Sequence, residues 1–304
     1  MSESIIVLIT GANSGIGYAT ARTIASQPNY HVIMACRDLS RGHEACSQLK
    51  TAGIHGTLSV LQLDVEDDTS ISKAFDIVSN QFGRVDVFIS NAGTTSPGSV
   101  GRDKIGNIFS TNVFGAMLAT DAFIPLLVQS RRPCLIQISS RLGSLALASD
   151  PQNAKSSETW DEYRMSKAAL NMMTIQMHKR LKDQNVRVFA FCPGLVRSNL
   201  RGVSEEAVSA QVEALVLNLR VLMVDDKQNW KSSDVIAEDM VTQDHALPVV
   251  KHLQEQLTLA NGRTDPVVLK FVLPRASGDV VKVGFLPQRL ECVGSHVSNV
   301  MSFL

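Results

Sequence analysis

The stretch SIIVLITGANSGIG, residues 4–17, decides the fold. Its first half, Ser4 to Thr10, is a continuous run of apolar and β-branched residues, typical of a strand buried on both faces of a parallel sheet. Glycines follow at positions 11, 15 and 17, and a helix then runs to about Gln27. Such a loop can place a pyrophosphate at the helix N-terminus, where N–H groups and the helix dipole favour an anion. We therefore predict a nucleotide site; the alternative is a tight turn that needs glycines only for positive φ.

The strand-then-helix alternation continues to Cys192. Helical patterns separate further apolar, strand-like runs at residues 31–36, 57–63, 85–90, 135–139 and 186–192. Alternation of this kind predicts an α/β fold, with a single Rossmann-type, doubly wound parallel sheet of six to seven strands flanked by helices. No repeat or linker divides the chain, so residues 1–304 are expected to form one NAD(P)-binding domain.

The end of the second strand bears on which nucleotide is bound. An acidic residue there would bind the ribose 2′-hydroxyl of NAD, whereas an arginine accommodates the 2′-phosphate of NADP. This chain has Cys36 at the acid position and Arg37 after it. The prediction is NADP(H), and the alternative is that Arg37 is an ordinary solvated loop arginine.

Tyr163 and Lys167 stand four residues apart in a segment with helical character, from Trp160 to Arg180. Positions i and i+4 share one helix face, so the phenol and the ammonium should project side by side. The cation favours the phenolate and should lower the pKa of Tyr163, which suits proton transfer near neutral pH. Taken alone, this pair fits equally an amphipathic helix that happens to carry both residues.

Together the motifs resemble the classical short-chain dehydrogenase/reductase family. They are Thr10-Gly-x-x-x-Gly-Ile-Gly17, Asn91-Ala-Gly93, Ser139-Ser140, Tyr163-x-x-x-Lys167 and Pro193-Gly194, in the family's order and across residues 4–202. The resemblance, which is closest to carbonyl reductases, implies a nicotinamide dinucleotide lying across the carboxyl ends of the strands. It also implies hydride transfer between NADPH and a ketone or aldehyde, as carbonyl reduction or secondary alcohol oxidation.

The resemblance assigns cofactor contacts residue by residue. The glycine loop would hold the pyrophosphate, Asp64-Val65 the adenine, Asn91 to Gly93 the adenine ribose, and the segment after the sixth strand the nicotinamide. The full set is Gly11, Asn13, Ser14, Gly15, Ile16, Gly17, Arg37, Asp64, Val65, Asn91, Ala92, Gly93, Tyr163, Lys167, Pro193, Gly194, Val196 and Ser198. Asp64 could equally be a helix cap, and Asn91 to Gly93 a turn.

The resemblance also implies four catalytic residues: Asn112, Ser140, Tyr163 and Lys167. Tyr163 would be the general acid/base, and Ser140 would polarise the substrate oxygen. Lys167 would hold the nicotinamide ribose and lower the pKa of Tyr163, while Asn112 would hold a proton-relay water. Strand alternation should point Ser139 away from Ser140, although both serines could simply be turn formers.

Two regions depart from the family pattern. Ser140 and Tyr163 are separated by a longer insert than usual, which bears on the oligomeric state: a dimer, a tetramer or a monomer. After Gly202 the match fades. Residues 195–230 are expected to form a substrate lid whose leucines and valines favour an apolar substrate, and 231–304 a divergent C-terminal part of the same domain.

The composition argues against several other classes of function. The net charge is +0, so no basic excess indicates nucleic acid or an anionic membrane surface, and no apolar run reads as a membrane span. The five cysteines form no C-x-x-C pair, and the seven histidines are scattered, which predicts a reduced, cytoplasmic protein without a metal site.

The sequence therefore predicts an NADP-dependent short-chain dehydrogenase/reductase with a small-molecule carbonyl or alcohol substrate. Two alternatives stay open at this point: a nucleotide-binding regulator with the same fold, and a non-redox isomerase or cyclase reaction at the same site.

Overall fold

The computed structural model describes residues 4–54, 56–95, 101–150 and 160–193. All of them belong to the first of two compact units of the chain, Met1–His245, and the architecture below is that of this unit. Gly194, Val196, Ser198, the predicted lid and the C-terminal part lie outside the described residues. The expectations for them, and for a single domain over 304 residues, stay predictions.

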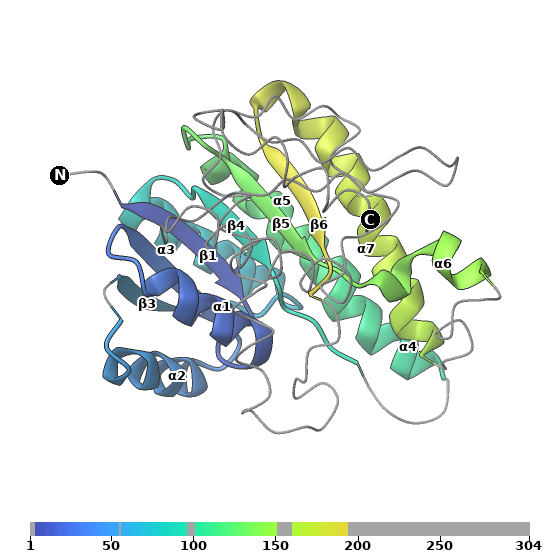
Figure 1. Ribbon diagram of the computed structural model, residues 1–304, viewed down its shortest axis with the longest axis horizontal. Helices are drawn as coiled ribbons and strands as arrows, with labels where there is room; N and C mark the ends of the chain where they lie inside the picture. Colours follow the sequence, from blue (N-terminus) through green and yellow to red (C-terminus); the bar gives the residue numbers. More distant parts are fainter. Residues whose placement is uncertain (1–3, 55, 96–100, 151–159, 194–304) are drawn as a thin grey trace, which may run out of the picture. The chain divides into compact units, whose positions relative to one another are not determined.

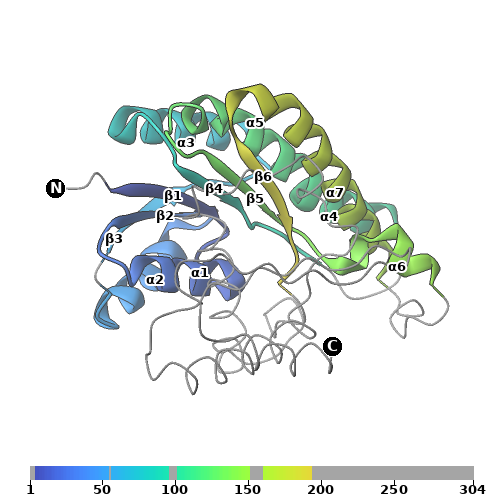
Figure 2. The same ribbon diagram turned by 45° about the horizontal axis from the view of Figure 1, so that its top comes forward.

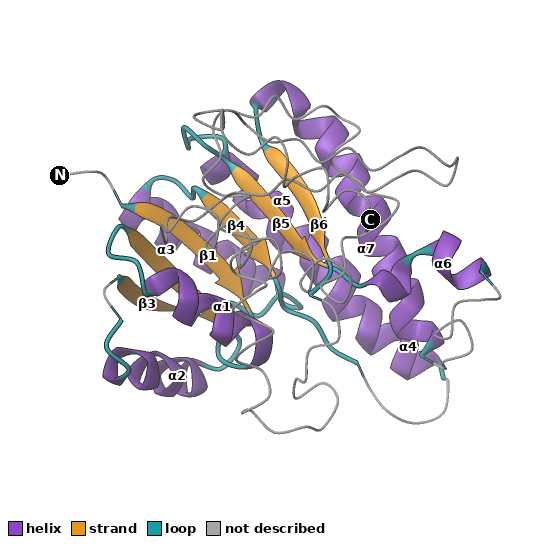
Figure 3. Cartoon of the chain, in the orientation of Figure 1, coloured by secondary structure: helices purple, strands orange, loops and turns teal. Residues whose placement is uncertain are grey.

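A parallel sheet of six strands forms the centre of the described residues (Figures 1 and 3). The strands, in chain order, are β1 (Ile5–Thr10), β2 (Tyr30–Cys36), β3 (Thr57–Gln62), β4 (Val87–Ser90), β5 (Cys134–Ile138) and β6 (Arg187–Phe191). They lie side by side in the order β3-β2-β1-β4-β5-β6, and each neighbouring pair is parallel. The order reverses between β1 and β4, which confirms the predicted doubly wound, Rossmann-type sheet.

The apolar run that opens the sequence is β1, and it is buried on both faces as expected. Val7 and Ile9 pack in one core cluster, whereas Ile6 and Leu8 pack in the other. Successive side chains of a strand point to opposite faces, so only an uninterrupted apolar run can fill both clusters.

Helices cover the two faces of the sheet unequally (Figure 2). One cluster joins it to α1 and α2, and the other joins it to α3, α5 and α7. The helices are α1 (Gly15–Ala25), α2 (Leu39–Thr51), α3 (Asp68–Phe82), α4 (Arg102–Phe109), α5 (Ala116–Leu127), α6 (Leu145–Ser149) and α7 (Asp161–Leu181), with 3-10 turns η2 (Arg141–Gly143) and η3 (Lys182–Gln184).

Helices α4 and α5 form one continuous helical run, Arg102–Leu127, because a π-helical segment, η1 (Ser110–Gly115), joins them. By length and composition alone this run is apolar enough to cross a membrane. Its fully buried Phe123 and Leu127 belong to the core cluster beneath α5, however, and this position accounts for its apolar composition.

One local prediction is wrong. The serine-rich composition from Leu142 to Thr159 predicts an irregular segment, but the chain forms η2 and then the short helix α6 at its start. The serines that suggested a loop are helix caps: the Ser140 hydroxyl accepts from the Leu142 N–H at 3.2 Å, and the Ser144 hydroxyl from the Leu147 N–H at 3.2 Å. Serine favours both roles, so composition alone could not separate them.

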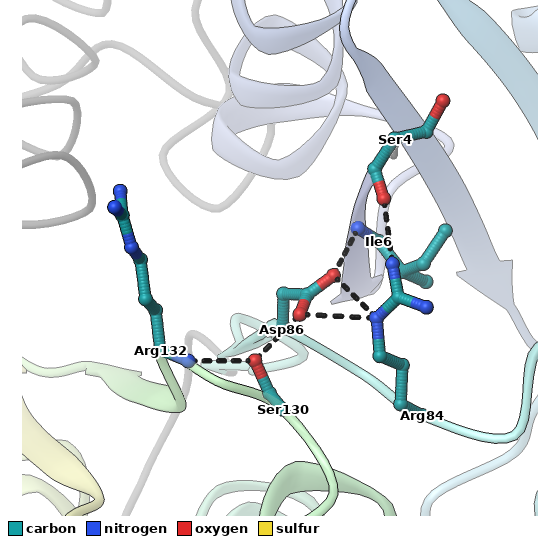
Figure 4. Close-up of polar contacts among 6 residues, drawn as sticks. All are labelled: Ser4, Ile6, Arg84, Asp86, Ser130 and Arg132. Atoms are coloured by element: carbon teal, nitrogen blue, oxygen red, sulfur yellow. Dashed lines mark hydrogen bonds and ion pairs between the residues drawn. The ribbon is translucent and has the colours of Figure 1, made fainter. Parts of the chain in front are cut away.

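A polar cluster fastens the amino end of the sheet (Figure 4). The Asp86 carboxylate accepts hydrogen bonds from the Ile6 N–H at 2.7 Å, the Arg84 Nε at 3.3 Å and the Ser130 hydroxyl at 2.5 Å. Arg84 Nη2 also donates to the Ser4 carbonyl at 2.9 Å. One carboxylate thus ties β1, the start of β4 and the connection into β5 together.

Candidate active site

A cavity of about 1430 Å³ lies along the carboxyl edge of the sheet. The predicted site residues that line it are Gly11, Asn13, Ser14, Gly15, Ile16, Arg37, Asp64, Val65, Asn91, Ala92, Gly93, Tyr163, Lys167 and Pro193. Among the described residues predicted for the site, Gly17, Asn112 and Ser140 do not line the cavity. These residues follow the ends of β1, β2, β3, β4 and β6 or lie in the N-terminal parts of α1 and α7. They share one cavity at the point where strand order reverses, which is where ligands of open α/β sheets bind.

The glycine loop is held tightly against the end of β4. Gly11 and Gly15 have φ values of +65° and +55°, which disfavour any residue with a side chain. A Cβ on Gly17 would lie 2.5 Å from the Gly11 carbonyl oxygen and 2.6 Å from Asn91 Nδ2. Asn91 Nδ2 donates to the Thr10 carbonyl at 2.8 Å. The turn therefore needs its glycines, and Gly11 and Gly15 also line the cavity. Nucleotide binding by this loop stays a prediction.

The N-terminus of α1 is suited to an anion. Its first turn has no acidic residue, and within the described chain Ser14 makes no side-chain capping bond. By contrast, Asp38 and Asp67 cap α2 and α3 through bonds to the Arg41 and Thr69 N–H groups. The α1 terminus thus presents N–H groups and the positive dipole end to the cavity, and this fits the pyrophosphate of a dinucleotide.

Two arginines meet at the end of β2. Arg37, Asp38 and Arg41 all line the cavity. Asp38 Oδ2 lies 3.8 Å from Arg41 Nε, and both side chains are more than half exposed. Arg41 was not among the predicted residues, and it adds a second cation to the cavity wall.

Just after β3, Asp64 forms local hydrogen bonds with the chain that follows it. Its carboxylate accepts from the Glu66 N–H at 3.1 Å, and its N–H donates to the Ser70 hydroxyl at 2.9 Å. Val65 is buried, and a Cβ on Gly115 would lie 2.7 Å from its carbonyl oxygen. Asp64 is not the helix cap that was its alternative role, because Asp67 caps α3. Both Asp64 and Val65 line the cavity.

Tyr163 and Lys167 lie on the α7 face that meets the sheet edge. Lys167 Nζ is 5.6 Å from the centroid of the Tyr163 ring. The same ammonium donates to the Ile138 carbonyl at 2.9 Å, so it lies between the end of β5 and the phenol. A cation fixed so close to a phenol stabilises the phenolate.

Lys167 is deeply buried, with 4% of its surface exposed. Burial lowers the pKa of its ammonium to about 8. The group still carries its charge at neutral pH, and it loses the charge within the mildly alkaline range.

Asn112 stands inside the π-helical segment. Its Oδ1 accepts from the Thr94 N–H at 2.7 Å, and its Nδ2 donates to the Thr94 carbonyl at 2.9 Å and to the Ser166 hydroxyl at 3.1 Å. π segments are rare and are frequent at functional sites. Here the segment turns an asparagine towards the loop after β4 and ties that loop to α7.

Ser139 and Ser140 point in different directions, as strand alternation requires. Ser139 is buried, and its hydroxyl donates to Asn171 Oδ1 of α7 at 2.5 Å. Ser140 is half-buried and caps η2. The serine predicted to touch substrate thus lies beside the described cavity rather than in its wall.

The comparisons with known proteins decide the family. A model of the short chain dehydrogenase family matches residues 5–209, about two thirds of the chain. The protein belongs to the short-chain dehydrogenase family. It is therefore an oxidoreductase of a family that uses a nicotinamide cofactor to interconvert carbonyl and alcohol groups. This confirms the resemblance to the short-chain dehydrogenase/reductase family that the sequence motifs indicated.

Several relatives give the scale of this similarity. A short-chain dehydrogenase of Penicillium roqueforti, anuI, is 35% identical over 206 residues, covering 65% of this chain and 81% of its own. The (+)-neomenthol dehydrogenase of Capsicum annuum is 25% identical over 288 residues, covering 71% and 91%. The NADPH-bound carbonyl reductase from chicken fatty liver superposes with a TM-score of 0.63 at 25% identity, covering 77% and 95%.

In this dehydrogenase, α7 is held against β5 at its middle. A Cβ on Gly143 would lie only 2.5 Å from the Lys167 carbonyl carbon, so η2 touches the helix backbone itself. Asn171 Nδ2 donates to the Gly143 carbonyl at 3.4 Å, and Asn171 Oδ1 accepts the bond from the Ser139 hydroxyl. These contacts fix the depth at which Lys167 enters the site.

The dehydrogenase also has cavity residues that the motifs did not predict. Besides Arg41, the wall includes Thr94, Thr95 and Trp160. One feature of the sequence could have indicated Arg41. The helix dipole disfavours a basic residue in the first turn of a helix, so a basic residue there indicates another role. Among the described residues no group of three or more His, Cys, Asp or Glu could hold a metal ion.

Proposed function

We propose that this short-chain dehydrogenase is an NADPH-dependent reductase of ketones or aldehydes, with Tyr163 as its general acid. The observation that carries the proposal is the buried Lys167 ammonium, placed between the Ile138 carbonyl and the Tyr163 ring in the same cavity as the glycine loop. A bound nicotinamide supplies the hydride, and the protein supplies the proton.

The chain's own groups can move that proton. Tyr163 gives it to the carbonyl oxygen, and the charge of Lys167 stabilises the phenolate left behind. Ser140 is the second residue after β5 and would donate its hydroxyl to the same oxygen once substrate is present. Asn112 fixes the Thr94 loop opposite α7 and, through Ser166, the turn that carries Tyr163.

The preference for NADPH rests on the end of β2. Arg37 and Arg41 both line the cavity wall, and Asp38, which also lines it, lies 3.8 Å from Arg41. Guanidinium groups there suit a 2′-phosphate, which arginine binds bidentately. The NADPH-bound chicken carbonyl reductase supports the same choice by similarity.

Substituting Arg37 with alanine tests this choice. NADPH should bind roughly 10- to 100-fold more weakly, since a charge-assisted bond to phosphate is lost, while NADH affinity stays unchanged. Arg41→Ala should act in the same direction. Fluorescence titrations with both cofactors measure the effect. Equal weakening of NADPH and NADH by Arg37→Ala would contradict the assignment.

The substrate side of the cavity is proposed to be apolar and flat. Trp160 lines the wall, and its ring meets the Tyr163 ring edge-on at a centroid distance of 6.3 Å. An indole beside the proton donor favours a planar, unsaturated group next to the reacting carbonyl.

The decisive assay mixes the protein with NADPH and a panel of carbonyl compounds and follows loss of the reduced nicotinamide. We expect turnover, with aryl ketones reduced at a higher kcat/KM than open-chain ketones of equal carbon number. Tight NADPH binding without turnover of any carbonyl would favour a nucleotide-binding regulator. The reverse order of ketones would contradict the role of Trp160 but leave the reductase assignment intact.

The cellular setting is part of the same proposal. Four cysteines, Cys36, Cys46, Cys134 and Cys192, are buried free thiols, which suits a reducing compartment such as the cytoplasm. A homo-oligomer also stays a proposal, and gel filtration with light scattering tests it.

A further inference from the structure

Two polar pairs join the long helix to α7 along one seam. Lys104 Nζ lies 2.9 Å from Glu162 Oε1, and Asn112 Nδ2 lies 3.1 Å from the Ser166 hydroxyl. Lys104 and Asn112 are eight positions apart, two helical repeats of four, and Glu162 and Ser166 are one repeat apart. From the first pair to the second, the residue numbers rise on both helices. The two helices also lie side by side in both views (Figures 1 and 2). The seam thus sets how the first turn of α7 sits against α4.

The ion pair of this seam is unusually buried. The Glu162 side chain is 2% exposed and that of Lys104 16%. Removing a carboxylate from water is costly and is tolerated only with a partner. The bond from Lys104 accordingly holds the pKa of Glu162 below its usual value. A buried pair adds little net stability, so its value lies in fixing one arrangement.

Lys104 also stands where its own helix does not favour it. It lies in the first turn of α4, where the positive end of the helix dipole repels a cation. Among the described residues, neither Lys104 nor Glu162 lines the cavity. A role in binding cofactor therefore does not explain the pair.

The turn fixed by the pair is the turn that carries the proton donor. Glu162 directly precedes Tyr163, and Trp160 begins the helix with a φ of +113°, a value that costs a residue with a side chain. Lys167, one turn further on, is fixed independently by Ile138 and Gly143. The distance between the phenol and the ammonium therefore depends on how the first turn is held.

Resting on the proposed function, we infer that the Lys104–Glu162 ion pair positions the first turn of α7, and with it the Tyr163 hydroxyl, relative to Lys167 for proton transfer. Both are positioning residues, acting through Tyr163 and touching neither cofactor nor substrate. A displacement of about 1 Å at a reacting group can lower a rate by about 100-fold, so a modest shift of this turn matters.

The test compares Glu162→Gln and Lys104→Met with the wild type. We expect kcat to fall roughly 10- to 100-fold while the stoichiometry and affinity of NADPH binding stay unchanged. Lys104→Arg keeps the charge and should stay near wild-type kcat. The matched control is Asp121→Asn, which breaks the Arg180–Asp121 ion pair that joins α5 to the far end of α7, and it should leave kcat unchanged.

A second readout needs no turnover. The chain has three tyrosines, so the difference between each protein and its Tyr163→Phe form isolates the ultraviolet titration of Tyr163. Removing the Glu162 charge alone would lower the Tyr163 pKa, whereas moving the phenol away from Lys167 would raise it. We expect a raised pKa in Glu162→Gln.

The two readouts separate the inference from the function on which it rests. No carbonyl turnover by the wild type, together with a raised Tyr163 pKa in Glu162→Gln, would overturn the proposed reaction and keep the positioning role. A lowered pKa, or a kcat loss equalled by Asp121→Asn, would overturn the positioning role. Loss of NADPH sites in parallel with activity would do the same, because it indicates general misfolding.

Discussion

Replacing Tyr163 with phenylalanine should lower kcat/KM for carbonyl reduction about 1000-fold and leave NADPH affinity nearly unchanged. The substitution removes the one hydroxyl beside Lys167 that the proposal uses as proton donor, and it keeps the ring that meets Trp160. Positioned general acids contribute roughly 100- to 10,000-fold, so an effect of this size is expected from the lost proton alone. Stopped-flow oxidation of NADPH and a separate binding titration measure the two quantities.

The matched control is Tyr30→Phe. Tyr30 begins β2 at the amino end of the sheet, where it is buried in the core cluster beneath α1 and α2. The same loss of a hydroxyl there should leave kcat/KM unchanged. Retained turnover in Tyr163→Phe would remove Tyr163 from the role of general acid.

Replacing Lys167 with methionine should lower kcat/KM roughly 100- to 1000-fold, because the phenolate of Tyr163 loses its neighbouring charge in a buried site. The pH profile gives the sharper evidence. Burial lowers the pKa of Lys167 to about 8, so wild-type kcat/KM for NADPH should fall above about pH 8, where the ammonium becomes neutral. Lys167→Met should lack this alkaline limb, and a limb retained at the same pH would assign it to another group.

The same lysine links stability to pH with a definite sign. Its pKa is about 8 in the folded chain, against 10.5 for an unperturbed lysine, so between these values the unfolded chain binds more protons. Stability should therefore rise with pH through that window, and the cost of burying the charge, about 3 kcal/mol, is fully present below it. Urea unfolding at neutral and alkaline pH should show this rise for the wild type relative to Lys167→Met. Parallel stability curves would contradict the depressed pKa.

The sheet was predictable because its signals are local. An apolar run such as Ile5 to Thr10 can only be a strand buried on both faces, and glycines at positions of positive φ mark the turn that follows. The order of strand and helix then fixes a doubly wound sheet. Boundaries moved by a residue or two, as in β4, which begins at Val87 rather than Val85.

What escaped prediction depends on contacts between distant segments. Serine caps and serine turns have the same composition, so η2 and α6 were missed. Arg41 joins Arg37 only once α2 is placed, and the Lys104–Glu162 pair needs the pairing of α4 with α7. Spacing within one helix gives the face of a residue but does not say which helix that face meets.

The Asp86 cluster gives the molecule two edges with different tolerances to change. Asp86 precedes β4 and Asn91 follows it, so about 16 Å of strand separates the fastened edge from the cavity edge. Substitutions in the loops at the carboxyl edge can therefore change which carbonyl compound is accepted without loosening the contacts that hold β1, β4 and β5 together. A scaffold built this way can acquire new substrates by small steps, each of which still folds.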